Sequence, residues 1–140
     1  MEITANAVQT VTSNNDVLFT STPVSGNCST VHREGSGIIK LRGLSTTQCR
    51  ARFRVSFTGN IALPADGTRG PISIAISVDG EPLASTIMTV TPAAVSQFFN
   101  VASASYIDVP TGCCSAISVK NVSSVSIEVR NANLIVERVA

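Results

Sequence analysis

The chain of 140 residues has no tryptophan, one tyrosine and five phenylalanines, so aromatic residues make up only 4% of it. Proteins that hold sugars or nucleobases by stacking usually present aromatic rings on the binding face. The scarcity of such rings gives no support to a stacking platform for either ligand.

Charged residues are also scarce, at 14%, and they almost cancel: ten Lys and Arg against nine Asp and Glu give a formal charge of +1. A chain with so little net charge has no strong positive field to attract nucleic acids or anionic membranes. We therefore expect no nucleic-acid partner. Uncharged polar and apolar residues must cover much of the exposed area instead, which indicates oligomerisation.

No run of about 18 apolar residues occurs, so the sequence predicts no membrane insertion. The opening "MEITANAVQTV" carries Glu2 where a secretory signal would carry Lys or Arg, and it has no continuous apolar segment. No export signal is visible.

The single histidine, His32, is the only imidazole that could act as a base for a serine or cysteine nucleophile. It stands beside Arg33 and Glu34 at a predicted turn, and no G-x-S-x-G motif accompanies any serine. We expect no catalytic residue, no metal ligand and no cofactor, and hence a protein that is not an enzyme.

Four cysteines, an even number, permit two disulfides in an oxidising compartment; they are Cys28, Cys49, Cys113 and Cys114. Their spacing does not fit paired C-x-x-C zinc motifs. Neighbouring cysteines rarely bond each other. An oxidised monomer would therefore join Cys113 and Cys114 to Cys28 and Cys49 in an order that stays open, and buried free thiols are the alternative.

Apolar residues alternate with period two along most of the chain, and no helical stripe is sustained, which predicts an all-β fold. Asp79-Gly80 is a strong hairpin signal. Thr91 and Pro92 could begin a short helix, but we favour strand from Phe98. An antiparallel β-sandwich of roughly eight to ten strands is expected, as one jelly-roll domain over 1–140 with 1–15 as an N-terminal arm. The expected strands cover 16–24, 29–33, 37–43, 49–57, 72–78, 81–90, 98–110, 115–121 and 124–139, the last bent at 131–133.

The stretch "CRARFRVSF" (49–57) alternates most strictly. Its apolar side is expected in the core; it consists of Ala51, Phe53, Val55 and Phe57. The opposite side places arginines about 7 Å apart, within reach of carboxylates on a neighbouring strand or subunit. The candidate interface comprises Arg50, Arg52, Arg54, Glu128 and Glu137. A row that merely faces solvent is the alternative.

The order of several motifs resembles the trimeric jelly roll of tumour necrosis factor and the complement-type globular head, a fold that also closes bacterial collagen-like spore and surface proteins. The motifs are "VLFTSTPV", "GIIKLRGLSTTQCRARFRVSF", "ISIAISVDGEPLASTIMTV", "YIDVPTGCCSAISVKN" and "NANLIVERV". The hairpin Val78–Leu83 is the most specific of them, and the resemblance covers most of 16–139. It implies a compact homotrimer for display, adhesion or decoration of a larger assembly, without catalysis.

The chain also looks like small proteins encoded in prophages and gut-bacterial genomes. We expect a structural or attachment module on a phage virion, as a capsid decoration or a head or tail fibre, or on a cell surface. Its partners would be copies of itself and a capsid, tail or other surface protein. The alternative is the C-terminal head of a bacterial collagen-like or spore-surface protein. Glycan binding is a further option and predicts a shallow polar pocket, with a bound cation near Asp66, Asp79 or Asp108.

Trimerisation would place one set of apolar residues in the core or on the trimer axis. These are Val125, Ile127, Val129, Leu134 and Val136.

Overall fold

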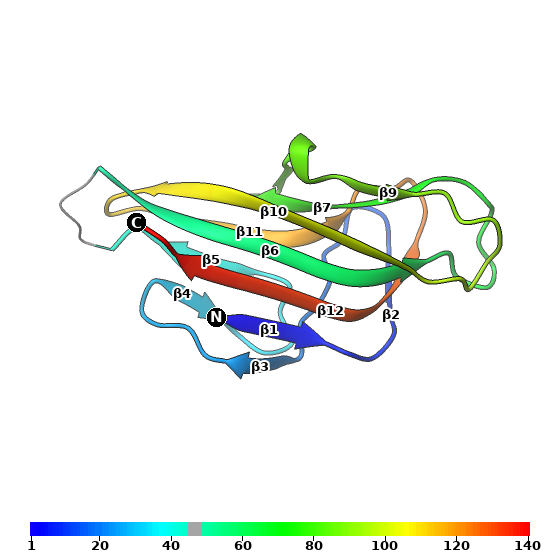
Figure 1. Ribbon diagram of the computed structural model, residues 1–140, viewed down its shortest axis with the longest axis horizontal. Coiled ribbons are helices and arrows are strands. Elements are labelled where there is room, and N and C mark those ends of the chain that lie inside the picture. The colour runs from blue at the N-terminus through cyan, green and yellow to red at the C-terminus, as the bar shows by residue number, and fades with distance from the viewer. Residues whose placement is uncertain (45–48) are drawn as a thin grey trace.

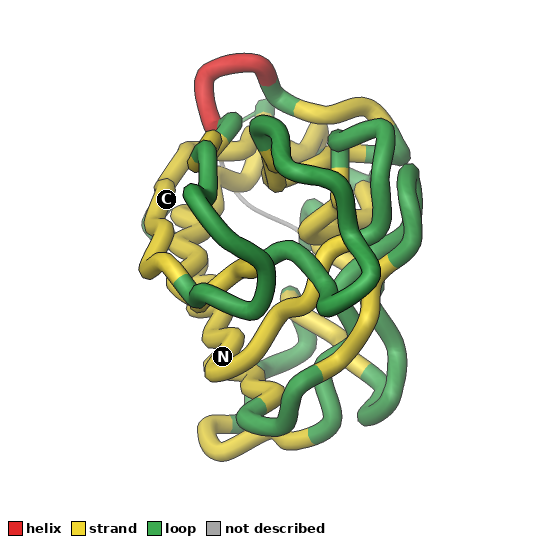
Figure 2. The backbone as a smooth tube through the Cα atoms, turned by 90° about the vertical axis from the view of Figure 1, so that its right-hand side faces the viewer, coloured by secondary structure: helices red, strands yellow, loops and turns green. Residues whose placement is uncertain are grey.

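Two antiparallel β-sheets pack face to face and enclose a single apolar core (Figures 1 and 2). The computed structural model describes residues 1–44 and 49–140, so 45–48, inside the second of the motifs above, lie outside the described residues. Sheet A has the strand order β10 (Phe99–Pro110), β6 (Arg50–Ala62), β12 (Ile127–Arg138), β1 (Glu2–Ala5) and β3 (Ser21–Val24), with β2 (Gln9–Val11) also on β12. Sheet B has the order β4 (Thr30–His32), β5 (Ile39–Arg42), β11 (Cys114–Asn121), β7 (Ile72–Val78) and β8 (Glu81–Pro82), with β9 (Met88–Val90) also on β7.

The all-β jelly-roll prediction is confirmed, and strand β6 shows its physical basis. Its apolar side is completely buried, with Ala51, Phe53, Val55 and Phe57 at 0% exposure. Strand β12 buries a second row, Ile127, Val129, Leu134 and Val136, at 1% exposure or less. These residues lie in the core, whereas Val125 precedes β12 and is 36% exposed.

The expected bend near 131–133 is a β-bulge in β12. The pairing of β12 with β6 shifts register between Arg130 and Asn133, and Asn131 has a φ of 52°. Asparagine tolerates this left-handed conformation better than most residues. The extra residue restores the inward alternation, so that Val129 and Ala132 both face the core although they are three positions apart.

The hairpin signals also appear where the sequence predicts them. Asp79 and Gly80 have φ values of 52° and 86°, as a type I′ turn requires, and they join β7 to β8. Strands β4 and β5 form the expected pair around Gly35, whose φ is 88°.

Three expected segments differ in detail. Of the strand expected at 16–24, only Ser21–Val24 forms a strand, β3. The backbone N–H groups of residues 17 and 19 donate to the carbonyls of Val119 and Ser36 instead. A 3-10 helix, η1 (Ala84–Thr86), interrupts the return from the 79–80 turn; it is held by Thr86, whose buried hydroxyl bonds Ile76. Residues 1–15 include β1 and β2, both paired with β12.

No α-helix begins at Thr91 among the described residues. Nor does any helix in the described ranges have the length and apolar character needed to cross a bilayer.

Candidate interaction surface

The side of sheet A that points away from the core forms an exposed face, here called the outer face. Its centre consists of small and aliphatic side chains: Ala104 pairs with Ser56, and Ser56 pairs with Ile135. Tyr106 and Ile135 stand out, with 65% and 43% of their area exposed. The other members of the face are Glu2, Thr4, Arg50, Arg52, Arg54, Thr58, Ala102, Asp108, Asn133 and Glu137.

The arginine row of β6 lies at one end of this face, and Asp108 on β10 is its main partner. Arg52 donates from Nε to Oδ1 at 2.8 Å and from one terminal nitrogen to Oδ2 at 3.1 Å. Arg50 Nε lies 3.0 Å from Oδ2 of the same carboxylate. Two guanidinium groups thus share one carboxylate within the chain.

This pairing changes the acid–base properties of both partners. The hydrogen bonds from Arg52 hold the pKa of Asp108 below its ordinary value; the positive charges of Arg52 and Arg50 act in the same direction, against desolvation. The same hydrogen bonds and the charge of Asp108 raise the pKa of Arg52. Both side chains are about 40% exposed, at 38% and 41%, so solvent screens much of the attraction.

The structure separates the two carboxylates that the sequence analysis grouped with the arginines. Glu137 pairs with Arg54 in register, with 3.9 Å between Nη1 and Oε1. Glu128 lies at the other end of β12, opposite Ala62 and Thr10. From the sequence, Asp108 was expected only as a neighbour of a bound cation and not as a partner of the arginines. Its position opposite Arg52 depends on the register of β10 against β6, which the sequence pattern alone does not specify.

A row of asparagines crosses sheet A at the end far from the arginines, and sequence reasoning missed it. Asn100 donates to Oδ1 of Asn60 at 3.2 Å, and Asn60 donates to Oδ1 of Asn131, also at 3.2 Å. Beside it, the guanidinium of Arg130 stacks 4.1 Å above the ring of Phe98. Only the turn-like "NAN" at 131–133 marked this end in the sequence.

No disulfide joins the four cysteines in the described structure, so their pairing stays a prediction. Cys28, Cys49, Cys113 and Cys114 are free and exposed, so the alternative of buried thiols is wrong. Cys114 is the only one of the four in a described strand, where it pairs with Arg42. The four still gather at one end of the sandwich. There Arg42 reaches the carbonyl of Cys28, and Gly43 donates to that of Cys113.

The groups considered for chemistry are engaged in structural bonds. The ring nitrogens of His32 contact the Ser36 carbonyl at 3.0 Å and the Thr22 hydroxyl at 3.4 Å. Asp79 accepts a bond from the backbone N–H of Ala116. Over residues 1–44 and 49–140, no three His, Cys, Asp or Glu side chains are close enough together to hold a metal ion.

Comparison with known proteins shows the fold. No protein-family model matches the chain, and no curated protein matches its sequence. The globular domain of the zebrafish complement 1qA protein superimposes with a TM-score of 0.63 at 10% identity, over 96% of this chain and 93% of that one. The C-terminal domain of the sugar-binding protein EclA gives a TM-score of 0.41 at 12% identity, over 94% and 79%. A family 35 carbohydrate-binding module of Clostridium thermocellum gives 0.39 at 13%, over 96% and 98%. The two sheets and the likeness to the complement domain together identify the fold as the jelly roll of complement-type globular heads.

Proposed function

We propose that the protein is a non-enzymatic module that assembles as a homotrimer through the outer face of sheet A and serves in attachment or display. The observation that carries this proposal is the composition of that face. Small residues such as Ala104 and Ser56 allow close approach, while Tyr106 and Ile135 offer apolar area that is exposed in the single chain. Tyrosine supplies large contact area at low entropic cost in protein interfaces.

The charges at the arginine end of the face support the same proposal. Burying an unpaired charge on association is costly. Arg50 and Arg52 already share Asp108 inside their own chain. Asp108 offsets one of these two positive charges, so a second copy that covers this end of the face has less unpaired charge to bury.

A non-enzymatic role fits the remaining polar groups. His32 is bonded through both ring nitrogens to structural partners. The Thr22 hydroxyl lies 3.4 Å from the His32 ring, farther than the roughly 2.6–3.2 Å at which a catalytic base takes a proton from a nucleophile. Display on a virion or a cell surface needs a stable fold and a face for assembly, and the outer face is the one proposed for it.

A pair of variants tests the proposal. Tyr106→Arg places a charge in the outer face and is expected to give monomers, because the added guanidinium would be buried without a partner. Val31→Arg is the matched control: Val31 is 47% exposed on β4 of sheet B, so this variant should keep the wild-type mass. Equal masses for both variants in light scattering would contradict assembly through the outer face.

The setting of the module needs a separate observation. Capsid and tail genes adjacent to the gene for this chain would support a virion protein. An upstream reading frame encoding Gly-X-Y repeats would support the head of a collagen-like surface protein instead.

A further inference from the structure

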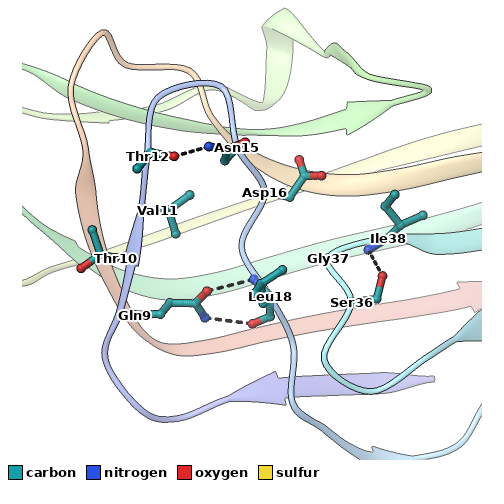
Figure 3. Close-up of a pocket in the computed structure, with 10 residues that line it drawn as sticks. All are labelled: Gln9, Thr10, Val11, Thr12, Asn15, Asp16, Leu18, Ser36, Gly37 and Ile38. Atoms are coloured by element: carbon teal, nitrogen blue, oxygen red, sulfur yellow. Dashed lines mark hydrogen bonds between the residues drawn. The ribbon is translucent and has the colours of Figure 1, made fainter.

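A groove of about 560 Å³ opens where β2 and the segment after it meet the loop that enters β5 (Figure 3). This volume lies within the range of about 300 to 1,000 Å³ that is common for small-molecule sites. The lining residues come from 9–12, 15–16, 18 and 36–38. None of them is among the residues named above for the outer face, although Thr10 on β2 lies on the same side of sheet A, opposite Glu128.

The groove walls are held by specific bonds. The side-chain amide of Gln9 donates to the Leu18 carbonyl at 2.8 Å and accepts from the Leu18 N–H at 2.9 Å, the paired contacts drawn in Figure 3. Gly37 brings the opposite wall close: a Cβ there would lie 2.8 Å from both Asp16 Cβ and the Val17 carbonyl. The groove is therefore formed before any ligand arrives.

Asp16 carries the one charge in this lining, and its Oδ1 is buried without a hydrogen-bond partner among the described residues. A buried carboxylate oxygen without a donor is unusual, because desolvation is then uncompensated. Lys120 is the β-bridge partner of Asp16, but its ammonium donates to the Gly80 carbonyl at 2.9 Å. Oδ1 itself has almost no accessible surface, so ligand hydroxyls in the groove would bond the other oxygen of the carboxylate, Oδ2.

The rest of the lining selects the class of ligand. Thr10, Thr12 and Ser36 contribute hydroxyl groups. Leu18 and Ile38 contribute aliphatic surface and are 48% and 49% exposed. No Lys or Arg lines the groove, which disfavours an anion; a single carboxylate near Lys120 is a weak site for a cation. A sugar ring carries hydroxyl groups around its edge and C–H groups on its face. The hydroxyls and the carboxylate of the groove match the edge, and the two apolar side chains match the face.

We propose that this groove binds a neutral saccharide unit. The Asp16 carboxylate accepts bonds from ligand hydroxyls, and the apolar face of the ring packs on Leu18 and Ile38. The inference rests on the proposed attachment role, for which it supplies the ligand class.

The test is a titration of the full ¹⁵N-labelled chain, followed by amide NMR. The probes are the methyl glycosides of glucose, galactose, mannose, N-acetylglucosamine and fucose, with the peptide Lys-Lys-Lys as the cationic probe. At least one glycoside should cause saturable shifts confined to the groove amides, such as those of Asp16 and Gly37. Asp16→Asn should weaken that binding at least tenfold, and Asp66→Asn, a carboxylate in an exposed loop, should change it less than twofold.

Thr10→Arg provides a second variant that does not alter the carboxylate. Thr10 is exposed and faces Glu128 on β12, so the fold accommodates an arginine that narrows the groove. This variant should also abolish the shifts. Silence with every glycoside, shifts with the lysine peptide alone, or binding unaffected by both groove variants would overturn the saccharide proposal. The native mass of the same samples reports separately on the trimer, so the two proposals can fail independently.

Discussion

Arg52 and Asp108 face each other across β6 and β10, and the guanidinium holds the carboxylate by two hydrogen bonds of 2.8 and 3.1 Å. Asp108 also pairs with Arg50, so this end of the outer face is partly neutralised within the chain. It gives the proposed assembly a charge arrangement that can be tested by substitution.

Charge reversal at this pair is the first prediction. Arg52→Glu sets two carboxylates directly opposite each other, an arrangement that destabilises sheets, and it leaves Arg50 as the only counter-ion. We expect a folded chain, since the side chain points away from the core, with a weakened trimer in sedimentation analysis. The exchanged double variant Arg52→Glu/Asp108→Arg should recover assembly. Full assembly of the single variant would mean that the row serves only as solvated surface.

The same pair predicts a pH dependence. The pKa of Asp108 is lowered in the folded chain, chiefly by hydrogen bonds from Arg52. The unfolded chain binds this proton more readily, near the ordinary pKa of about 3.9. The pair therefore stabilises the fold at pH values above that point, and the contribution is lost as pH falls through the folded pKa. The melting temperature should fall less between neutral and acidic pH in Asp108→Asn than in the wild type. An identical fall in both proteins would argue against the pairing.

Two neighbouring residues of β12 point to opposite sides of sheet A, one into the core and one onto the outer face. Val136 is fully buried, so Val136→Asp should cost about 3 to 5 kcal/mol and unfold the chain. Ile135 is 43% exposed on the outer face, so Ile135→Asp should keep the circular-dichroism spectrum but lower the native mass. Comparable stability of the two variants would contradict the difference in burial between Val136 and Ile135.

The cysteines supply a prediction about covalent state. All four thiols are free and exposed. Iodoacetamide should therefore label four sites in the native, non-reduced protein, as counted by intact-mass spectrometry. A mass four hydrogens lower with no labelling would show two disulfides and contradict the structure.

The strands were predictable because burial imposes a short-range pattern. Phe53 and Val55 alternate with arginines on one strand, and Asp79-Gly80 adopts the positive φ values that its residue types favour. The η1 turn was missed because Thr86 is held by a bond to Ile76, a contact that no local pattern encodes.

The candidate sites depend on contacts between distant segments, and this limits what the sequence reveals about them. Arg52 meets Asp108 across 56 positions, so the arginine row was recognised but its main partner was not. The groove proposed for a saccharide requires Gly37 to pack against Asp16 and Val17. This close approach depends on how two loops pack together. The alternation of apolar and polar residues along a single strand does not predict such packing.

Assembly of three copies is the central claim, and the native mass of the purified chain measures it most directly. Size-exclusion chromatography with light scattering, run over a range of micromolar concentrations, should give three times the chain mass of 14.5 kDa. A constant mass of one chain over the whole range would contradict the proposed trimer.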